Sequence, residues 1–185
     1  RNGKWEKGGL TDDANVVLNE CAGILQYGQQ VFEGLKAYHT KDGRVVTFRP
    51  DLNASRLVDS AKRLEMPPVP EEMFMEAVEA VVSANKEWIP PYESGGSLYL
   101  RPYIFATGPV IGVKPADEYQ FRLFGTPVGS YFKGGVKPIT LCVSDFDRAA
   151  PHGTGHIKAG LNYAMSLHAY IQAHSKGYDE NLFLD

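Results

Sequence analysis

The chain has 185 residues, of which 43% are hydrophobic and 22% are charged, and its formal net charge is −3. This composition supports one packed domain, or one domain and part of a second, and it argues against intrinsic disorder. Because the sequence has neither a basic stripe nor an apolar run long enough for a membrane span, we expect no nucleic-acid partner and no membrane partner.

The cysteines and the chain ends give two further expectations. Cys21 and Cys142 lie far apart without metal-ligand spacing, so we interpret them as small buried side chains in a reducing compartment, and we expect a cytoplasmic protein. The chain starts at Arg1 and stops in an apolar, strand-like run over residues 181–185. Because a natural terminus rarely falls inside a buried strand, we expect a piece of a longer protein.

The first half of the chain predicts one strand followed by two helices. Residues 43–48 follow an Asp-Gly turn and have the composition of a strand. A helix is expected from Pro50 to the Pro67-Pro68 pair, because apolar residues recur there at spacings of three and four. A second helix is expected between Pro70 and Pro90.

The second half predicts three strands and a long helix. Period-two alternation over residues 97–106 predicts a strand with Tyr99 and Arg101 on one face and Leu98 and Leu100 on the other. Strands are also expected at 119–126 and 137–143. A helix is expected over 161–175. Its predicted apolar stripe consists of Ala164, Leu167, His168 and Ile171.

This order of elements predicts an α+β chain in two parts. We expect a small α/β domain over residues 1–130 and an interdomain loop over 131–136. Residues 137–185 would then begin a larger, mainly β domain whose remainder is absent, so that the chain is truncated.

The most informative motif is the glycine-rich stretch over residues 153–163, which contains Lys158. Most lysines lie on solvated faces, so a lysine on a turn of small residues is unusual. This setting suits a lysine that forms a Schiff base. A surface lysine after a flexible loop is the alternative interpretation.

Two arginines suggest anion sites. Burying Arg101 beside Tyr99 would be costly without an anion, which favours a carboxylate site, although an exposed edge face is equally possible. Arg56 falls near a predicted helix start, where a cation opposes the helix dipole, so a nearby phosphate would explain it and a surface position is the alternative. His152 and His156 flank the lysine loop without a third ligand, and we expect no metal.

Taken together, these stretches resemble the branched-chain amino acid aminotransferases, which are pyridoxal-phosphate enzymes of fold type IV. The resemblance extends over nearly the whole chain and rests on the order and spacing of its pieces. They are Tyr27 to Lys36, Phe48-Arg49-Pro50, Ser55-Arg56, Glu87 to Pro90, Ser97 to Pro102, Pro127 to Phe132, and Gly153 to Tyr163.

The resemblance implies pyridoxal 5'-phosphate as the cofactor and assigns it to particular residues. Lys158 would be the catalytic residue, carrying the cofactor and then moving the α-proton of the substrate. Tyr163 would hydrogen-bond the ring oxygen of the cofactor, and Arg56 would hold its phosphate. Tyr99 would bind the substrate carboxylate, and Arg101 would meet the side-chain carboxylate of glutamate.

The resemblance also implies a substrate pocket that is shared between two subunits. Phe32 and Tyr131 would line the side-chain pocket. Tyr27, Ile111 and Val113 would close the pocket of the neighbouring subunit in a homodimer. The implied reaction is transamination between L-leucine, L-isoleucine or L-valine and 2-oxoglutarate, so that the partners are amino acids and 2-oxo acids.

The sequence departs from the family pattern in several places. Cys21 and Cys142 do not form the Cys-x-x-Cys pair of some members, and the family's extra N-terminal strand is expected to be incomplete here. Leu161 stands where the family commonly has a second glycine. The family also continues for about another 150 residues, roughly one further domain, which supply an acid facing the pyridine nitrogen. Two alternatives therefore stay open: a non-catalytic fragment, and a related enzyme such as a D-amino acid aminotransferase or an aminodeoxychorismate lyase.

Overall fold

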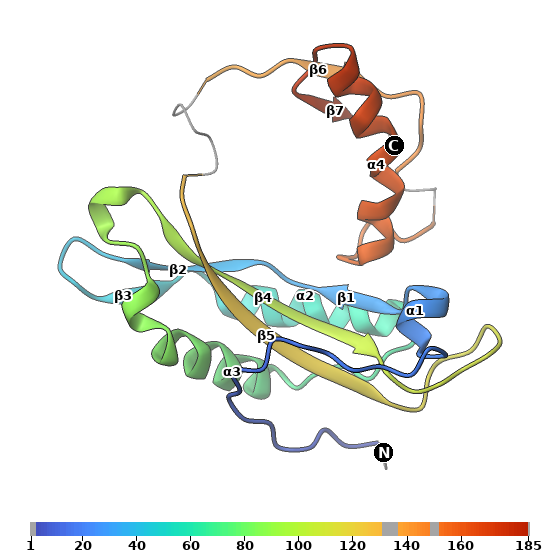
Figure 1. Cartoon of the computed structure of the whole chain (residues 1–185), viewed down its shortest axis with the longest axis horizontal. Helices are drawn as coiled ribbons and strands as arrows, with labels where there is room; N and C mark the ends of the chain where they lie inside the picture. Colours follow the sequence, from blue (N-terminus) through green and yellow to red (C-terminus); the bar gives the residue numbers. More distant parts are fainter. Residues whose placement is uncertain (1–2, 131–136, 149–151, 185) are drawn as a thin grey trace.

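The computed structural model describes residues 3–130, 137–148 and 152–184, and within them an antiparallel sheet of five strands forms the first part of the molecule (Figure 1). The long strand β4 (Ser97–Ala106) lies at its centre and pairs along its whole length with β5 (Tyr119–Val128). Its other side pairs with β1 (Gln30–Phe32) and then with β2 (Leu35–His39). Strand β3 (Val45–Thr47) pairs with β2, and the short helix α1 (Gly23–Tyr27) precedes β1.

Helices α2 (Pro50–Arg63) and α3 (Glu71–Ala84) cover one face of this sheet, and single 3-10 turns follow at Lys86–Trp88 and Tyr92–Ser94. Leu98 and Leu100 of β4 pack there against Leu57 and Phe74 in the main core, and all four side chains are at most 1% exposed. The predicted alternation of β4 is confirmed, and burial of these apolar side chains is the main force that seats the helices on the sheet.

The other face of β4 carries Tyr99, Arg101 and Tyr103, which are half-buried. Because β4 is hydrogen-bonded on both sides, the interpretation of this stretch as an exposed sheet edge is wrong. From this face the Arg101 guanidinium reaches the Phe32 ring of β1.

The C-terminal part forms a second, smaller body, drawn in orange and red above the sheet in Figure 1. It consists of the parallel pair β6 (Leu141–Val143) and β7 (Glu180–Leu182) and the helix α4 (Gly160–Ser175) between them in sequence. The N-terminal end of α4 lies nearest the sheet. This arrangement places the residues just before α4 against β1.

The predicted strand at 137–143 is longer than the observed β6, which begins only at Leu141. The reason is local hydrogen bonding: the backbone N–H of Thr140 donates to the Asp179 carboxylate at 2.7 Å rather than to a strand. The predicted helix over 161–175 is confirmed within one residue, and β5 runs two residues beyond its predicted end.

The predicted apolar stripe of α4 is not the buried face of this helix. Leu167 and Ile171 are 60% and 63% exposed, whereas Ala169 and Ala173 are buried on the side of the helix that packs towards β6 and β7. Small side chains allow a helix to approach its neighbour closely, and the prediction had assigned the larger side chains to that role. Cys21 and Cys142 are half-buried free thiols rather than fully buried side chains.

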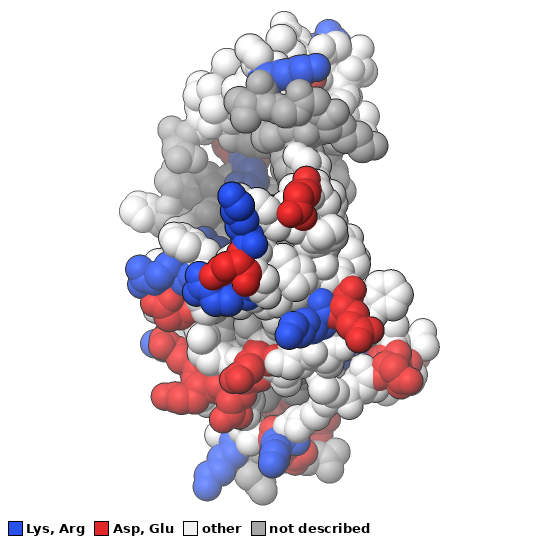
Figure 2. All heavy atoms as spheres, turned by 90° about the vertical axis from the view of Figure 1, so that its left-hand side faces the viewer, with Lys and Arg blue, Asp and Glu red and all other residues white. Residues whose placement is uncertain are grey.

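The surface is mixed in charge where the β2–β3 hairpin and α3 lie. Figure 2 shows acidic and basic side chains interspersed on this face. Within the described residues, no helix is both long and apolar enough to cross a bilayer.

Candidate active site

The loop before Lys158 is held by one buried side chain, that of Asn162 in the first turn of α4. Its amide donates hydrogen bonds to the carbonyl oxygens of Thr154 (2.7 Å) and Ile157 (3.0 Å), and its Oδ1 accepts one from the Thr154 hydroxyl (2.7 Å). Asn162 is 2% exposed, so breaking these bonds would leave buried polar groups without partners. The loop therefore follows a fixed path into Lys158.

The backbone around Lys158 continues the sheet. The carbonyl of Lys158 accepts a hydrogen bond from the Phe32 N–H at 3.0 Å, and Val31 forms an antiparallel bridge with Ala159. Residues that lie more than 120 positions apart are thereby joined at the edge of β1. The interpretation of Lys158 as a surface lysine on a flexible loop does not fit this backbone pairing.

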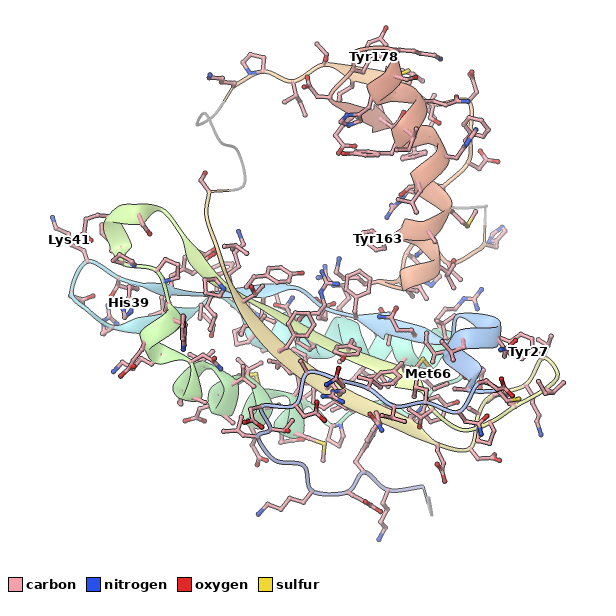
Figure 3. The ribbon with its side chains drawn as sticks, viewed as in Figure 1. Tyr27, His39, Lys41, Met66, Tyr163 and Tyr178 are labelled. Atoms are coloured by element: carbon pink, nitrogen blue, oxygen red, sulfur yellow. The ribbon has the colours of Figure 1, made fainter. Side chains whose placement is uncertain are left out.

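The side chain of Lys158 meets two aromatic rings. Its Nζ donates a hydrogen bond to the Tyr163 hydroxyl at 2.7 Å and lies 4.7 Å from the centroid of the Phe32 ring. The Phe32 and Tyr163 rings are 5.0 Å apart. Tyr163 projects from the first half of α4 towards the space above the sheet (Figure 3). The amine is thus held between a phenol oxygen and an aromatic face.

Arg101 approaches the same Phe32 ring from β4. Its guanidinium carbon lies 4.4 Å from the ring centroid, and its Nη2 and Nε donate to the Tyr99 hydroxyl at 2.8 and 3.2 Å. Phe32 therefore contacts both Lys158 and Arg101. A carboxylate that enters here would find guanidinium and phenol donors side by side, which is a suitable donor set for that group.

Arg56 projects from α2 and forms an ion pair with Glu33. Its Nε and Nη2 donate to the two oxygens of this carboxylate at 2.6 and 2.8 Å, and Asn53 donates to it at 2.8 Å. The Glu33 side chain is 0% exposed, whereas that of Arg56 is 53% exposed. The hydrogen bond to Glu33 raises the pKa of Arg56 above its ordinary value, and the Tyr163 hydroxyl adds a smaller electrostatic contribution.

The predicted position of Arg56 in a first helical turn is wrong, because α2 begins at Pro50 and Arg56 lies in its second turn. The anion beside Arg56 in this structure is the Glu33 carboxylate. The position of Arg56 on α2 is therefore no evidence for a bound phosphate. Half of the guanidinium remains exposed, which leaves it able to bind a second anion.

Of the remaining predicted pocket residues, three lie away from Lys158 and one is outside the described residues. Tyr27 sits at the α1 end of the sheet, distant from Tyr163 in Figure 3, and its hydroxyl accepts a hydrogen bond from the Gly112 N–H at 2.6 Å. This bond holds Ile111 and Val113, which are 74% and 94% exposed, beside Tyr27. The three residues are together but not at Lys158 of the same chain. Tyr131 lies outside the described residues.

The residues present fit pyridoxal phosphate. An amine and a phenol are paired at hydrogen-bonding distance, and the Arg56 guanidinium is half-exposed and so able to bind an anion. An aldehyde, a ring oxygen and a phosphate are the groups that such a set can hold. Lys158, Tyr163 and Arg56 are the residues that would hold them.

Sequence reasoning missed two residues of this site, Glu33 and Asn162. Glu33 interrupts an apolar run between Phe32 and Gly34, and a lone acid in such a run was the available signal. Asn162 lies in the first helical turn, where an amide commonly bonds to the backbone before the helix. Their partners lie in space rather than at a fixed spacing, so the sequence did not identify them.

A shallow groove between the β2–β3 hairpin and the turn before β4 is separate from this site. It is lined by Tyr38, His39, Lys41 and Tyr92 among others, and Figure 3 places His39 and Lys41 at the end of the molecule opposite Tyr27. The nearby Asp42 is already paired with Arg44 at 2.7 Å. The chemistry of the lysine site does not extend to this groove.

The turn that docks on β1 therefore brings the Lys158 amine to Tyr163 and Phe32, and Arg101 reaches the same Phe32 ring. Residues 30–185 match the family described as amino-transferase class IV, so the chain belongs to the class IV aminotransferases. Within that family it is homologous to the branched-chain-amino-acid aminotransferases. It is 50% identical over 185 residues to that of Haemophilus influenzae and 49% identical over 187 residues to that of Helicobacter pylori.

Both sequence relatives extend well beyond the aligned part. The alignments cover 100% of this chain but 54% and 55% of the two relatives, so the chain spans about half their length. A relative of Arabidopsis thaliana that is named as chloroplastic is 50% identical over 186 residues and is covered to 45%.

Solved structures show the same fold. The T.th. branched-chain amino acid aminotransferase with pyridoxamine 5'-phosphate superposes with a TM-score of 0.77 at 31% identity, over 91% of this chain and 54% of that one. The Escherichia coli branched-chain amino acid aminotransferase gives 0.71 at 31% identity, over 94% and 54%. The T.th. protein has also been solved with N-(5'-phosphopyridoxyl)-L-glutamate, at 29% identity to this chain.

Proposed function

We propose that the protein transfers amino groups between branched-chain L-amino acids and 2-oxoglutarate, with pyridoxal 5'-phosphate as its cofactor. The observation that carries this proposal is the Lys158 amine, which lies 2.7 Å from the Tyr163 hydroxyl and over the Phe32 ring. The homology to branched-chain-amino-acid aminotransferases supports the choice of reaction. Pyridoxal phosphate, when bound, supplies an aldehyde for a lysine amine and an electron-withdrawing ring.

The residues around Lys158 have distinct tasks in this proposal. Lys158 Nζ binds the cofactor and, when free, moves a proton at the α-carbon of the substrate. Tyr163 orients that amine through its hydroxyl, and Arg56 binds the phosphate with the part of its guanidinium that Glu33 does not occupy. The Phe32 ring keeps water from one side of the amine.

The substrate pocket has to accept both an aliphatic and an acidic side chain. The Phe32 ring offers apolar surface, which stabilises a leucine side chain by about 25 cal/mol per Å² buried. Arg101 offers charge-assisted donors for the second carboxylate of glutamate, and Tyr99 offers a hydroxyl for the first. Tyr131 would complete this wall. Such a division lets one pocket serve both substrates in turn.

A homodimer is part of the same proposal. The 111–113 loop and Tyr27 form one exposed group that is not at the Lys158 site of its own chain. In a dimer this group would close the site of the neighbouring subunit. For location we keep the cytoplasmic prediction, although two relatives are named as chloroplastic.

The proposal is tested by trapping the cofactor on the protein. The chain is mixed with pyridoxal phosphate, reduced with borohydride and digested, and the peptides are mapped by mass. We expect one pyridoxyl-phosphate group on Lys158, and loss of that label in Lys158→Ala. Lys176→Ala, which removes a lysine just after α4, is the matched control and should keep the label. A label distributed over several lysines would contradict the assignment.

Substrate choice is tested separately, by turnover. L-leucine with 2-oxoglutarate should be turned over by the protein, and D-alanine should not be. Turnover of D-alanine alone would favour a D-amino acid aminotransferase. Cofactor trapping on Lys158 without turnover of either substrate would support the alternative that this chain is not catalytic by itself.

A further inference from the structure

A serine on α2 contacts the backbone of the reactive lysine. The Oγ of Ser60 accepts a hydrogen bond from the N–H of Lys158 at 3.1 Å, across 98 positions of sequence. Ser60 is 0% exposed. A hydroxyl is costly to bury unless it is hydrogen-bonded. The hydrogen bond to Lys158 explains why a serine, and not an alanine, fits this buried position of α2.

The same short segment is bound to the first part of the molecule at two further backbone groups. The Lys158 carbonyl accepts from the Phe32 N–H at 3.0 Å, and the Gly160 N–H donates to the side-chain oxygen of Gln30 at 3.1 Å. A Cβ at Gly160 would lie 2.5 Å from that Gln30 oxygen, so any larger residue there would displace the Gln30 side chain from this position. Ser60, Gln30 and β1 together satisfy three backbone groups of residues 158–160.

The neighbours of Lys158 are buried in the main core as well. Ile157 and Ala159 are 7% and 0% exposed and belong to the same cluster as Leu57 of α2. The lysine backbone is therefore seated on the first domain, and only its side chain reaches into the site. Ser60 is the residue of α2 that bonds directly to that backbone.

We propose that Ser60 is a positioning residue for Lys158. Its buried hydroxyl fixes the backbone of Lys158, so that the Cα–Cβ bond of the lysine points towards Tyr163 and Phe32. A lysine stem has four rotatable bonds, and an unfixed backbone would add two more degrees of freedom. Misplacement of a reacting group by about 1 Å can cost about a hundredfold in rate. This inference rests on the proposed function for its chemical consequence but not for its geometry.

The geometry is tested by amide hydrogen exchange in Ser60→Ala. We expect the Lys158 amide to exchange at least about tenfold faster than in the unmodified chain, while amides in the middle of β4 keep their rates. Ser97→Ala is the matched control, because Ser97 is also buried (2% exposed) but lies at the start of β4. Unchanged exchange at Lys158, or equal acceleration throughout the chain, would overturn the positioning role.

The chemical consequence is tested by the rate at which borohydride traps pyridoxal phosphate on Lys158. We expect about a tenfold slower rate in Ser60→Ala, no change in Ser97→Ala, and an intermediate rate in Ser60→Cys, whose thiol is a weaker acceptor of similar size. Ser60→Cys also serves if the alanine variant does not fold. Equal trapping in all variants would overturn the inference. If the unmodified chain traps nothing, the proposed function fails, and the exchange comparison still decides the role of Ser60.

Discussion

Glu33 illustrates how one buried side chain sets the orientation of another. Its carboxylate, which is 0% exposed, receives hydrogen bonds from Arg56 and Asn53 and from the Gly34 N–H. A carboxylate without these partners would be costly to bury, and Arg56 without Glu33 would be free to rotate. The pair therefore determines which edge of the Arg56 guanidinium is available to an anion.

Replacing Glu33 by Gln is expected to lower the free energy of unfolding by about 1–3 kcal/mol, because the amide presents donors to Arg56 where a carboxylate accepted. Urea unfolding at pH 7 measures the change. Asp51→Asn is the control, since it breaks the ion pair with Arg49 that is exposed on both sides, and we expect no measurable effect. Equal effects of the two variants would show that burial of Glu33 is not decisive.

The effect of pH on the stability contributed by the Arg56–Glu33 pair follows from the direction in which the pKa of Arg56 is shifted. Glu33 raises the pKa of Arg56, so the contribution of the Arg56 cation to stability is fully present below the ordinary pKa of an arginine. It is lost only as the pH rises through the still higher folded value. We therefore expect no titration of Arg56 between pH 5 and 9 in stability measurements.

Arg101 is expected to separate the two substrates. In Arg101→Ala, kcat/KM for glutamate should fall by roughly tenfold to a hundredfold, because a charge-assisted donor pair is lost, while kcat/KM for leucine should change much less. Arg101→Lys keeps the charge but loses the paired geometry. Its kcat/KM for glutamate should therefore lie between those of the unmodified chain and Arg101→Ala. Equal losses for glutamate and leucine would remove Arg101 from the side-chain pocket.

At the scale of elements, the β6–β7 pair depends on a contact outside its ladder. The Asp179 carboxylate accepts hydrogen bonds from the N–H and hydroxyl of Thr140 at 2.7 and 2.8 Å, just before both strands begin. The backbone hydrogen bond from Thr140 and then its hydroxyl lower the pKa of Asp179 below 3.8. These two strands have three residues each, so such a contact matters for where they pair.

We expect Asp179→Asn to increase amide exchange in β6 and β7 at pH 7 without changing that in β4. A lowered pKa stabilises the folded state above the ordinary value and loses this effect as the pH falls through the folded value. Exchange in the unmodified chain should therefore approach that of the variant as the pH falls through the lowered pKa of Asp179. Glu180→Gln, at the next position, is the control. Similar exchange in both variants at pH 7 would contradict the role of Asp179.

The whole molecule is asymmetric in its packing. The main core contains residues of β1, β2, β4, α2 and α3, and the lysine segment joins it through Ile157 and Ala159. The body formed by β6, α4 and β7 has Ala169 and Ala173 as its buried apolar side chains among the described residues. Stability should therefore come mainly from the sheet and its two helices.

One substitution at two positions tests this asymmetry. Leu100→Ala should lower the free energy of unfolding by about 2–5 kcal/mol, because it leaves a cavity in the core. Leu167→Ala should change it by less than about 0.5 kcal/mol, since Leu167 is 60% exposed and Leu100 is 0% exposed. Denaturant unfolding followed by circular dichroism measures both values. A comparable loss of unfolding free energy in Leu167→Ala would mean that the exposed face of α4 around Leu167 is covered in solution.

Much of the chain could be predicted from local pattern. The strand at 97–106 has its predicted ends, and the helices that follow Pro50, Pro70 and Gly160 begin within one residue of expectation. Alternation, proline and glycine act over a few residues, so a sequence contains these signals directly. The family resemblance rested on the same local stretches, and the match over residues 30–185 confirms it.

The sequence by itself determined the helices α2, α3 and α4, the strands β4 and β5, the family and the lysine on which the proposed chemistry depends. It did not predict α1, β1 or β2. Only the tertiary structure decided the partners: Glu33 for Arg56, Tyr99 for Arg101, and Ser60 for the Lys158 backbone. It also decided that small alanines rather than Leu167 face the interior of the C-terminal body. Local patterns record how a segment is shaped, whereas pairing between distant segments depends on which faces the packed core brings together.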